Sequence, residues 1–366
     1  MTRPNHGGNL RWAASLAGAS PTDLLDFSAS LNPLGPPSWL ANWLQQHYTQ
    51  LIAYPDPQYR QLREAIAKHH HCDPNWILPG NGAAELLTWA ARDFVDCREV
   101  LLLGPAFRDY ERALTAVGVP WRRLALPLDR PATLAILQNL LEPEIRADTG
   151  LLINNPHNPT GWLWPLRELW PLLQRCRLVI ADEAFLDFRP DAADWSLEPC
   201  LAESRSLVIV RSLTKFYSVA GLRLGYAIAH PDRLERWQQW RDPWSVNGLA
   251  AALGPELLAD RAFQAATWNW LPAARSALAN GLATIPGLRV LPSQANFLLV
   301  QAEHSVLPLQ ECLLQQHRIL IRDCLSFAEL GDRWFRVAVR SAAENQQLLQ
   351  AIATVLTDGR AGSMTA

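Results

Sequence analysis

Short apolar segments alternate with helical patterns through the middle of the chain, and this alternation limits its possible folds most strongly. The apolar segments lie at residues 100–103, 121–126, 151–153, 178–180 and 207–210, and helical patterns at 107–117 and 132–141 separate the first three. Strands that are apolar on both faces are typical of a mainly parallel sheet covered by helices on each side. In such sheets, ligands bind beyond the carboxyl ends of the strands. We therefore expect an α/β fold with its functional residues in the loops that follow these strands.

The pattern changes after about residue 234. It predicts helices over 246–258 and 261–283, strands near 289–290 and 296–300, a helix over 307–317, a strand over 334–339 and a last helix over 343–356. We expect a large domain over residues 46–235 and a smaller α+β domain over 236–356. Residues 1–45 form an N-terminal arm and part of the small domain in this prediction. The small, polar residues 357–366 are expected to be a flexible tail.

The composition excludes several classes of protein. Hydrophobic residues make up 49% of the 366 residues and charged residues 19%, and the formal net charge is −2. No block of Lys and Arg is present, which argues against a nucleic-acid or membrane-surface role. Every apolar stretch of membrane-spanning length contains a charge or a proline. We expect most of the 16 tryptophans to be buried in the core.

The cysteines indicate a reducing compartment. Six are scattered without a C-x-x-C pair, and the polar residues 1–10 do not resemble a signal peptide. We expect reduced thiols in a cytoplasmic protein. His69-His70-His71-Cys72 has metal-binding residue types, but adjacent helical residues point in different directions. We interpret this tract as a solvated helix end and expect no metal site.

Lysine is rare in this chain, which makes each lysine informative. Only Lys68 and Lys215 occur among the 33 basic residues. Arginine stays protonated and cannot form an imine, whereas a lysine amine can lose its proton and become a nucleophile. Lys68 lies near the end of a predicted helix over residues 59–71, where a cation suits the carbonyl end. Lys215 follows the apolar segment at 207–210 and is the candidate nucleophile.

Two loops have the composition of an anion site and a rigid amide. Gly80-Asn81-Gly82-Ala83-Ala84-Glu85 precedes a predicted helix over 84–92, and free N–H groups at a helix start suit a phosphate. The turn is not a G-x-G-x-x-G fingerprint, so it does not favour a dinucleotide. Pro156 and Pro159 flank Asn158 and fix the backbone, so its amide suits a phenolate oxygen. A plain turn remains the alternative at both places.

Charged and hydroxyl groups complete the set. Asp182 follows an apolar segment, where a carboxylate needs a partner, and a pyridinium nitrogen is a suitable one. Arg223 lies eight residues after Lys215 (223 − 215) and can bind a phosphate bidentately. Ser212 and Thr214 add hydroxyl groups. Phe107 can stack on a planar ring, with a place in the core as the alternative.

Three motifs carry a resemblance to a known family. They are Asn158-Pro159-Thr160-Gly161, Asp182-Glu183-Ala184, and Ser212-x-x-Lys215 with Gly221-x-Arg223-x-Gly225. In this order they resemble the aspartate-aminotransferase superfamily of pyridoxal-phosphate enzymes (fold type I), over nearly the whole chain. The resemblance implies that the large domain binds pyridoxal 5′-phosphate as an imine of Lys215. It implies Asp182 on the pyridine nitrogen and Asn158 on the phenolic oxygen.

The same resemblance assigns the other cofactor contacts. It implies that Gly82, Ala83, Ala84, Ser212 and Arg223 hold the cofactor phosphate and that Phe107 contacts the ring. Tyr54, in Tyr54-Pro55-Asp56-Pro57, would reach this phosphate across a homodimer interface. Two positions depart from relatives. Phe185 stands where many carry tyrosine, and Ala84 stands where histidinol-phosphate aminotransferases often carry an acid.

Further segments resemble the threonine-phosphate decarboxylases within this superfamily. They are His6-Gly7-Gly8-Asn9, residues 25–36, Ile321-Arg322-Asp323-Cys324 and residues 335–340. These enzymes convert O-phospho-L-threonine to (R)-1-aminopropan-2-yl phosphate for the cobalamin nucleotide loop. The resemblance implies that Arg336 binds the substrate carboxylate and that His6, Gly7 and Arg322 bind the rest of the substrate. Asn158 and Ser30 complete the predicted substrate site, although Ser30 replaces the usual asparagine.

Two other functions remain as alternatives. Histidinol-phosphate aminotransferases share the fold, the cofactor site and a phosphorylated amine substrate. The bond that breaks is the one perpendicular to the cofactor ring, so small differences in substrate rotation separate decarboxylation from transamination. A cofactor-sensing regulator would carry a basic DNA-binding domain, and residues 1–40 are too short and too weakly basic for one.

Overall fold

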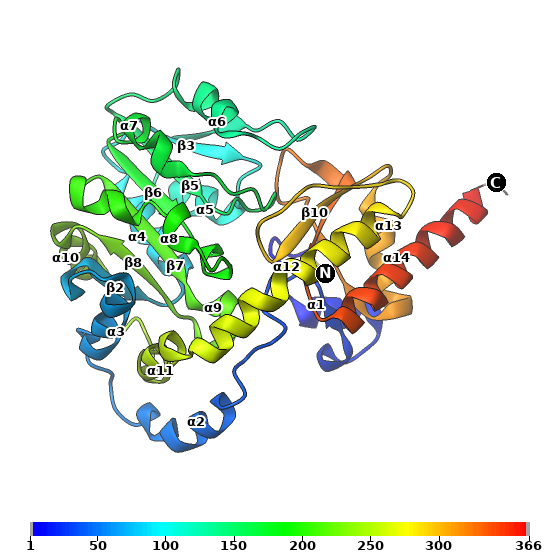
Figure 1. Cartoon of the computed structure of the whole chain (residues 1–366), viewed down its shortest axis with the longest axis horizontal. Helices are drawn as coiled ribbons and strands as arrows, with labels where there is room; N and C mark the ends of the chain where they lie inside the picture. The colour runs from blue at the N-terminus through cyan, green and yellow to red at the C-terminus, as the bar shows by residue number, and fades with distance from the viewer. Residues whose placement is uncertain (1–2, 364–366) are drawn as a thin grey trace. The chain divides into compact units, whose positions relative to one another are not determined.

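The computed structural model describes residues 3–363, which divide into two compact units. The large unit consists of Leu34–Asn158 and Trp162–Trp268. The small unit consists of the described parts of Met1–Pro33, Pro159–Gly161 and Asn269–Ala366. Each unit has its own sheet and helices, which are labelled in Figure 1.

A seven-stranded sheet forms the centre of the large unit. Its strand order is β2-β8-β7-β6-β5-β3-β4. All neighbouring pairs from β7 to β4 are parallel, and β8 is antiparallel to both β2 and β7. The mainly parallel sheet predicted from the alternating pattern is therefore confirmed. The strands are β2 (Ile77–Gly80), β3 (Glu99–Gly104), β4 (Trp121–Ala125), β5 (Thr149–Asn154), β6 (Leu178–Asp182), β7 (Leu207–Ser212) and β8 (Gly225–Ala229).

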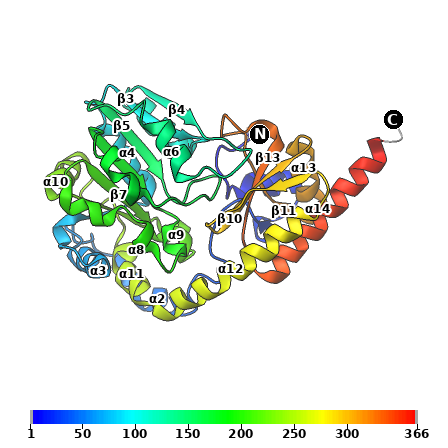
Figure 2. The same cartoon turned by 45° about the horizontal axis from the view of Figure 1, so that its top comes forward.

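Helices of the large unit cover both faces of this sheet (Figures 1 and 2). Val100, Leu102 and Ile180 pack in one core cluster with residues of α4, α5 and α10. The intervening Leu101 and Val179 are also fully buried, as strands with two covered faces require. The helices are α2 (Leu40–His47), α3 (Arg60–His70), α4 (Ala83–Asp93), α5 (Arg108–Ala116), α6 (Leu134–Leu141), α7 (Trp170–Leu173), α8 (Ala192–Trp195), α9 (Leu213–Phe216), α10 (Pro231–Trp240) and α11 (Gly248–Ala259).

The small unit contains two sheets. One has the order β12-β13-β10-β9 with antiparallel pairs, and the other joins β1 to β11 in parallel. Helix α12 (Arg261–Ala283) begins in the large unit and continues into the small one. The remaining elements are α1 (Leu10–Ala17), β1 (Leu25–Asp26), β9 (Leu288–Val290), β10 (Phe297–Ala302), α13 (Val306–His317), β11 (Ile319–Leu320), β12 (Arg322–Asp323), β13 (Trp334–Ala338) and α14 (Ala342–Ser363).

The unit boundaries differ from the predicted domains. Residues 34–45 and 236–268 were predicted outside the large domain, but they belong to the large unit. Packing explains the second difference, because Trp237 of α10 is fully buried in the core cluster of the large unit. The close approach of Gly254 in α11 to Leu62 of α3 has the same effect.

The last helix extends beyond its predicted end at residue 356. Helix α14 does not end at Leu356 but runs to Ser363, and residues 364–366 lie outside the described residues. Residues 357–363 contain no proline that would stop a helix, so the backbone hydrogen bonding continues through them.

Candidate active site

The strand register of the large unit brings the predicted functional loops to one edge of its sheet. Asn154 at the end of β5 pairs with Asp182 at the end of β6. At the end of β7, Ser212 pairs with Gly225, and Gly225 pairs with Gly80 at the end of β2. Antiparallel β8 therefore begins where the other strands end. The loops that carry Lys215, Asp182 and the glycine turn start from this common edge.

Lys215 lies on α9, one turn after the end of β7. Its Nζ donates a hydrogen bond to Ser212 Oγ at 3.0 Å, and Ser212 Oγ lies 2.7 Å from Thr214 Oγ1. The ring centroid of Phe185 lies 5.5 Å from Nζ, within the range of a cation–π contact. The half-buried amine is thus held between a hydroxyl group and an aromatic face.

Asp182 is a buried carboxylate with two donors. Its Oδ1 accepts the backbone N–H of Ala184 at 3.0 Å, and its Oδ2 accepts the hydroxyl of Tyr110 at 2.6 Å. Burial raises the pKa of Asp182, while the Tyr110 hydrogen bond and the charge of Lys215 act in the opposite direction. A cationic ligand group beside Asp182 would shift this balance further toward the carboxylate.

Tyr110 is a functional candidate that the sequence interpretation missed. It lies on α5, and its ring meets that of Phe107 edge-on, with centroids 5.4 Å apart. Phe107 itself is half-buried at the start of this helix. Within the predicted helix over 107–117, the pattern alone did not distinguish Tyr110 from an aromatic residue of the core. The available signal was the hydroxyl group, which needs a polar partner when it is buried.

The start of α4 and Arg223 form an anion cradle. Gly82 precedes the helix with φ 76°, and a Cβ placed there would lie 2.4 Å from Arg223 Nη2. A Cβ at Gly225 would lie 2.7 Å from the backbone nitrogen of Ala83. Only glycine therefore allows the guanidinium and β8 to approach the first turn, which contains Ala83 and Ala84. The N–H groups of this turn and the Arg223 cation suit a phosphate.

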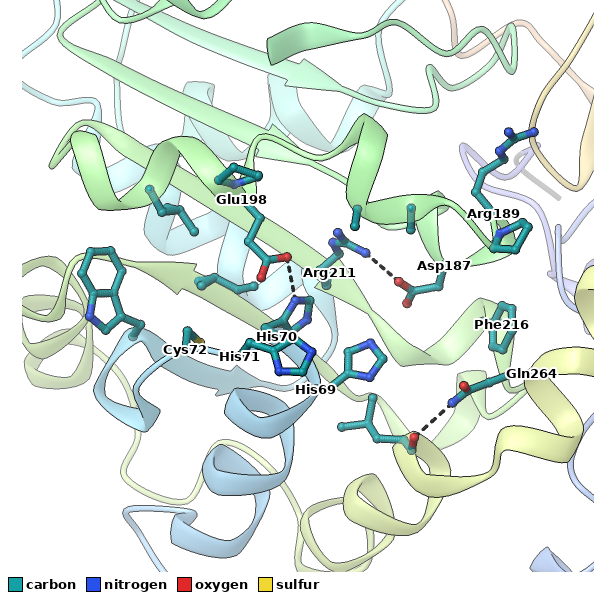
Figure 3. Close-up of a pocket in the computed structure, with 18 of the residues that line it drawn as sticks. His69, His70, His71, Cys72, Asp187, Arg189, Glu198, Arg211, Phe216 and Gln264 are labelled. Atoms are coloured by element: carbon teal, nitrogen blue, oxygen red, sulfur yellow. Dashed lines mark hydrogen bonds and ion pairs between the residues drawn. The ribbon is translucent and has the colours of Figure 1, made fainter.

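A cavity of about 670 Å³ lies in the large unit, and Phe216 and Tyr217, next to Lys215, form part of its wall (Figure 3). Arg211 on its wall forms ion pairs with Glu183 at 2.8 Å and Asp187 at 2.7 Å. Because Glu183 follows Asp182 and Arg211 precedes Ser212, this buried network ties together the ends of β6 and β7 beside the site.

The histidine tract is not simply a solvated helix end. His70 is buried: its Nδ1 lies 2.7 Å from Glu198 Oε2 and its Nε2 lies 2.8 Å from the Tyr226 hydroxyl. His69 lines the cavity, and burial lowers its pKa to about 4 (Figure 3). Only His71 of the three is exposed. The last turn of α3 packs on β8 at this point, which the helix pattern alone did not indicate.

The small unit contains a buried pair of arginines. Arg322 on β12 and Arg336 on β13 are directly opposite each other in the antiparallel register, with 5% and 8% of their surfaces exposed. Like charges at opposed strand positions repel each other unless an anion lies beside them. Burial, together with the charge of Arg322, lowers the pKa of Arg336 to about 10, so Arg336 remains a cation at neutral pH. This pair can bind a carboxylate or a phosphate.

The N-terminal arm packs beside these arginines. Arg322 donates to the carbonyl oxygen of Asn5, and the N–H of Gly8 donates to Ser28 Oγ at 2.8 Å. A Cβ at Gly7 would lie 2.3 Å from the backbone carbonyl oxygen of Ser28, so only glycine fits. Arg336 donates to the same Ser28 oxygen at 3.4 Å. Predicted substrate residues Gly7, Arg322 and Arg336 therefore share one neighbourhood.

The remaining predicted residues occupy different environments. Ser30 is buried, and its Oγ has no hydrogen-bond partner among the described residues. His6 is exposed and Asn158 is buried. Tyr54 is 80% exposed, and its ring lies against Trp244 with centroids 4.5 Å apart. Tyr54 thus lies on the exposed surface of its own chain, and the predicted cofactor residues Ala84 and Arg223 are exposed as well.

No helix within residues 3–363 combines the length and apolarity needed to cross a membrane. In the same part of the chain, His, Cys, Asp and Glu side chains form no group of three that could hold a metal ion.

Comparisons with known proteins extend over most of the chain. The family model described as aminotransferase class I and II matches residues 22–352. Threonine-phosphate decarboxylase of Salmonella typhimurium is 41% identical over 96% of each chain. Histidinol-phosphate aminotransferase of Symbiobacterium thermophilum is 31% identical over 92% of each. The crystal structure of L-threonine-O-3-phosphate decarboxylase from Porphyromonas gingivalis matches with a TM-score of 0.79 and 25% identity, covering 90% of this chain and 99% of the other.

Proposed function

The chain belongs to the aminotransferase class I and II family, and from this membership we propose that it decarboxylates O-phospho-L-threonine to (R)-1-aminopropan-2-yl phosphate. The buried, opposed pair Arg322 and Arg336 carries the proposal, because this substrate has two anionic groups, a carboxylate and a phosphate. The 41% identity to a threonine-phosphate decarboxylase supports the same substrate. The product amine would enter the nucleotide loop of cobalamin.

The residues present fit pyridoxal 5′-phosphate, the cofactor of this family. Lys215 supplies the amine for the aldehyde, and its neighbours Ser212 and Phe185 keep it at the sheet edge. The cradle of Gly82 and Arg223 suits the phosphate, and a Cβ at position 82 would fill it. When bound, the cofactor acts as the electron sink for the bond that breaks at the substrate α-carbon.

The large-unit residues provide the cofactor contacts in this proposal. Asp182 accepts a hydrogen bond from the ring nitrogen and keeps it protonated. Asn158 donates to the phenolic oxygen, and Phe107 stacks on the ring. The first turn of α4 (Ala83 and Ala84), Ser212 and Arg223 bind the phosphate. Lys215 also carries the proton to or from the substrate carbon.

Substrate binding is assigned to the small unit. We propose that Arg336 binds the carboxylate and that Arg322, His6 and Gly7 bind the phosphate. Ser30 is assigned to the substrate as well, and so is Asn158 of the large unit. Two anchored ends fix the rotation of the substrate about its α-carbon, which selects the bond that breaks. The unpartnered hydroxyl of Ser30 is available for a substrate oxygen.

A second candidate is histidinol-phosphate aminotransferase. The 31% identical relative supports it, and an arginine for a carboxylate serves an aminotransferase equally well. The higher identity to a threonine-phosphate decarboxylase, 41% against 31%, favours the decarboxylase.

Carbon dioxide release separates the two functions. We expect purified protein loaded with pyridoxal phosphate to release carbon dioxide from O-phospho-L-threonine in the absence of any keto acid. Mass spectrometry should detect the phosphorylated amine in equal amount. Amine transfer from histidinol phosphate to 2-oxoglutarate, without carbon dioxide release from phosphothreonine, would establish the alternative instead.

We also propose that the protein works as a homodimer in the cytoplasm. The six cysteines are free thiols, which fits a reducing compartment.

An exposed apolar surface is formed by Tyr48, Leu51, Ile52, Tyr54 and Trp244, and we call it the Ile52 surface. Four of these residues lie within residues 48–54, and Tyr54 packs against Trp244. Exposed apolar side chains gathered in this way are typical of protein interfaces. The close approach of Gly248 to Gln50 joins the segment around Ile52 to the start of α11. A second copy on this surface would bring Tyr54 to the neighbouring cofactor.

Ile52→Asp should dissociate this dimer. The side chain is 82% exposed in one chain, so the monomer should still fold, whereas a carboxylate inside an apolar interface costs several kcal/mol. We expect a dimer Kd increased on the order of 100-fold and a parallel loss of activity, measured by analytical ultracentrifugation and carbon dioxide release. Val95→Asp is the matched control, since Val95 is 63% exposed but outside this surface. A fully active Ile52→Asp monomer would refute the role of Tyr54.

A further inference from the structure

We propose that Tyr110 is a positioning residue of this enzyme, whose hydroxyl holds Asp182 as an ionised acceptor for the ring nitrogen of the cofactor. The inference deepens the proposed function and rests on it for the assignment of Asp182 to that nitrogen. Tyr110 belongs to none of the motifs that identify the family in this chain. Its role follows from the contacts of a buried hydroxyl group.

The hydrogen bonds of Asp182 favour its charged form. Oδ1 accepts a backbone N–H from Ala184, which can only donate, and Oδ2 accepts Tyr110 at 2.6 Å. An O–H···O distance of 2.6 Å is typical of a bond to an ionised oxygen. Burial raises the pKa of Tyr110 well above its ordinary value, so the phenol keeps its proton and remains a donor. Both oxygens of Asp182 are therefore oriented by donors from the protein.

The placement of Tyr110 is rigid. The residue is fully buried on α5 and belongs to the core cluster that includes α4 and β3. Phe107, the candidate stacking residue, meets its ring edge-on at the start of the same helix. One helix thus supplies the ring contact of Phe107 and the hydroxyl that orients Asp182.

Three neighbouring groups set the charge of Asp182. Lys215 on α9 favours the carboxylate, Asp109 on α5 opposes it, and Tyr110 favours it through the hydrogen bond. When the cofactor is attached, the Lys215 amine is bonded to the aldehyde, so its positive charge does not favour the Asp182 carboxylate at every stage of the reaction. The Tyr110 hydroxyl remains in place throughout, and it partly offsets the burial that favours the neutral acid.

Tyr110→Phe tests this role, because it removes the hydroxyl and keeps the ring. We expect kcat to fall about tenfold to a hundredfold with little change in KM, since one charge-assisted hydrogen bond is lost. Activity needs ionised Asp182, so it declines as the pH falls through the pKa of that group. Without the hydroxyl this pKa rises, and the acidic limb of the kcat profile should move to higher pH.

A binding measurement separates this inference from the reaction itself. Apoenzyme is titrated with pyridoxal phosphate and with its analogue in which C–H replaces the ring nitrogen, using tryptophan fluorescence. We expect the wild type to bind the natural cofactor with a lower Kd than the analogue. In Tyr110→Phe the ratio of the two Kd values should fall about tenfold. This result does not depend on which substrate is turned over, so it stands even if phosphothreonine releases no carbon dioxide.

Tyr226→Phe is the matched control. Tyr226 is also fully buried in the large unit, but its hydroxyl contacts His70. We expect this variant to lose stability without any shift of the pH profile or of the analogue preference. The inference is overturned if Tyr110→Phe behaves like Tyr226→Phe, with a lower Tm and an unchanged acidic limb and preference.

Discussion

Lys215→Ala is expected to lower the rate of carbon dioxide release on the order of 10⁴-fold or more and to remove the visible absorbance of the bound cofactor. The alanine has no amine to attach to the aldehyde and none to carry a proton at the substrate carbon. Steady-state kinetics and an absorbance spectrum after desalting measure the two losses independently.

The chain contains its own control for this experiment. Lys68 is the only other lysine, and it is exposed on α3. Lys68→Ala should retain wild-type activity and absorbance. Borohydride reduction followed by peptide mapping should label Lys215 alone. Labelling of Lys68, or normal turnover by Lys215→Ala, would contradict the assignment of the nucleophile.

Arg336→Ala should lower kcat/KM for O-phospho-L-threonine about 100-fold to 1,000-fold, because removing one partner of a buried, hydrogen-bonded charge pair costs roughly 3–4 kcal/mol of binding free energy. The absorbance of the cofactor on Lys215 should persist, since the cofactor residues lie in the other unit. Arg336→Lys should recover only part of the loss, because an ammonium cannot form the bidentate contact of a guanidinium.

Arg289→Ala is the control for loss of an arginine from the same sheet. Arg289 is exposed on β9, so its replacement should leave kcat/KM unchanged. Circular dichroism would reveal misfolding of Arg336→Ala caused by the missing buried side chain. A folded Arg336→Ala variant with unchanged kcat/KM would show that another group binds the substrate carboxylate.

The sequence was informative about the large unit because local patterns specify a parallel sheet. Its apolar segments predicted β3, β4, β5, β6 and β7. The carboxyl ends of parallel strands meet at one edge, so the residues that follow them were expected to converge. Asp182 is the last residue of β6, and Lys215 follows β7 at that edge.

The sequence was less informative where distant segments pair. The antiparallel strand β8 and its partner β2 were not predicted, yet their pairing brings Gly225 beside Gly80 and completes the cradle. The domain boundary was wrong because the burial of Trp237 depends on which core receives it. The hydrogen-bond partners of His70, Glu198 and Tyr226, were missed because they lie on distant segments of the chain.

Types of chemistry were determined by the sequence alone: a reactive lysine, a carboxylate after a buried strand, a glycine turn before a helix and a family to which they belong. The tertiary structure decided which groups touch one another. Only the strand register sets Arg322 opposite Arg336, and only the packing of α5 on the sheet directs the Tyr110 hydroxyl to Asp182. Local patterns follow from the preferences of neighbouring residues, whereas such contacts depend on the register and packing of segments far apart in the chain.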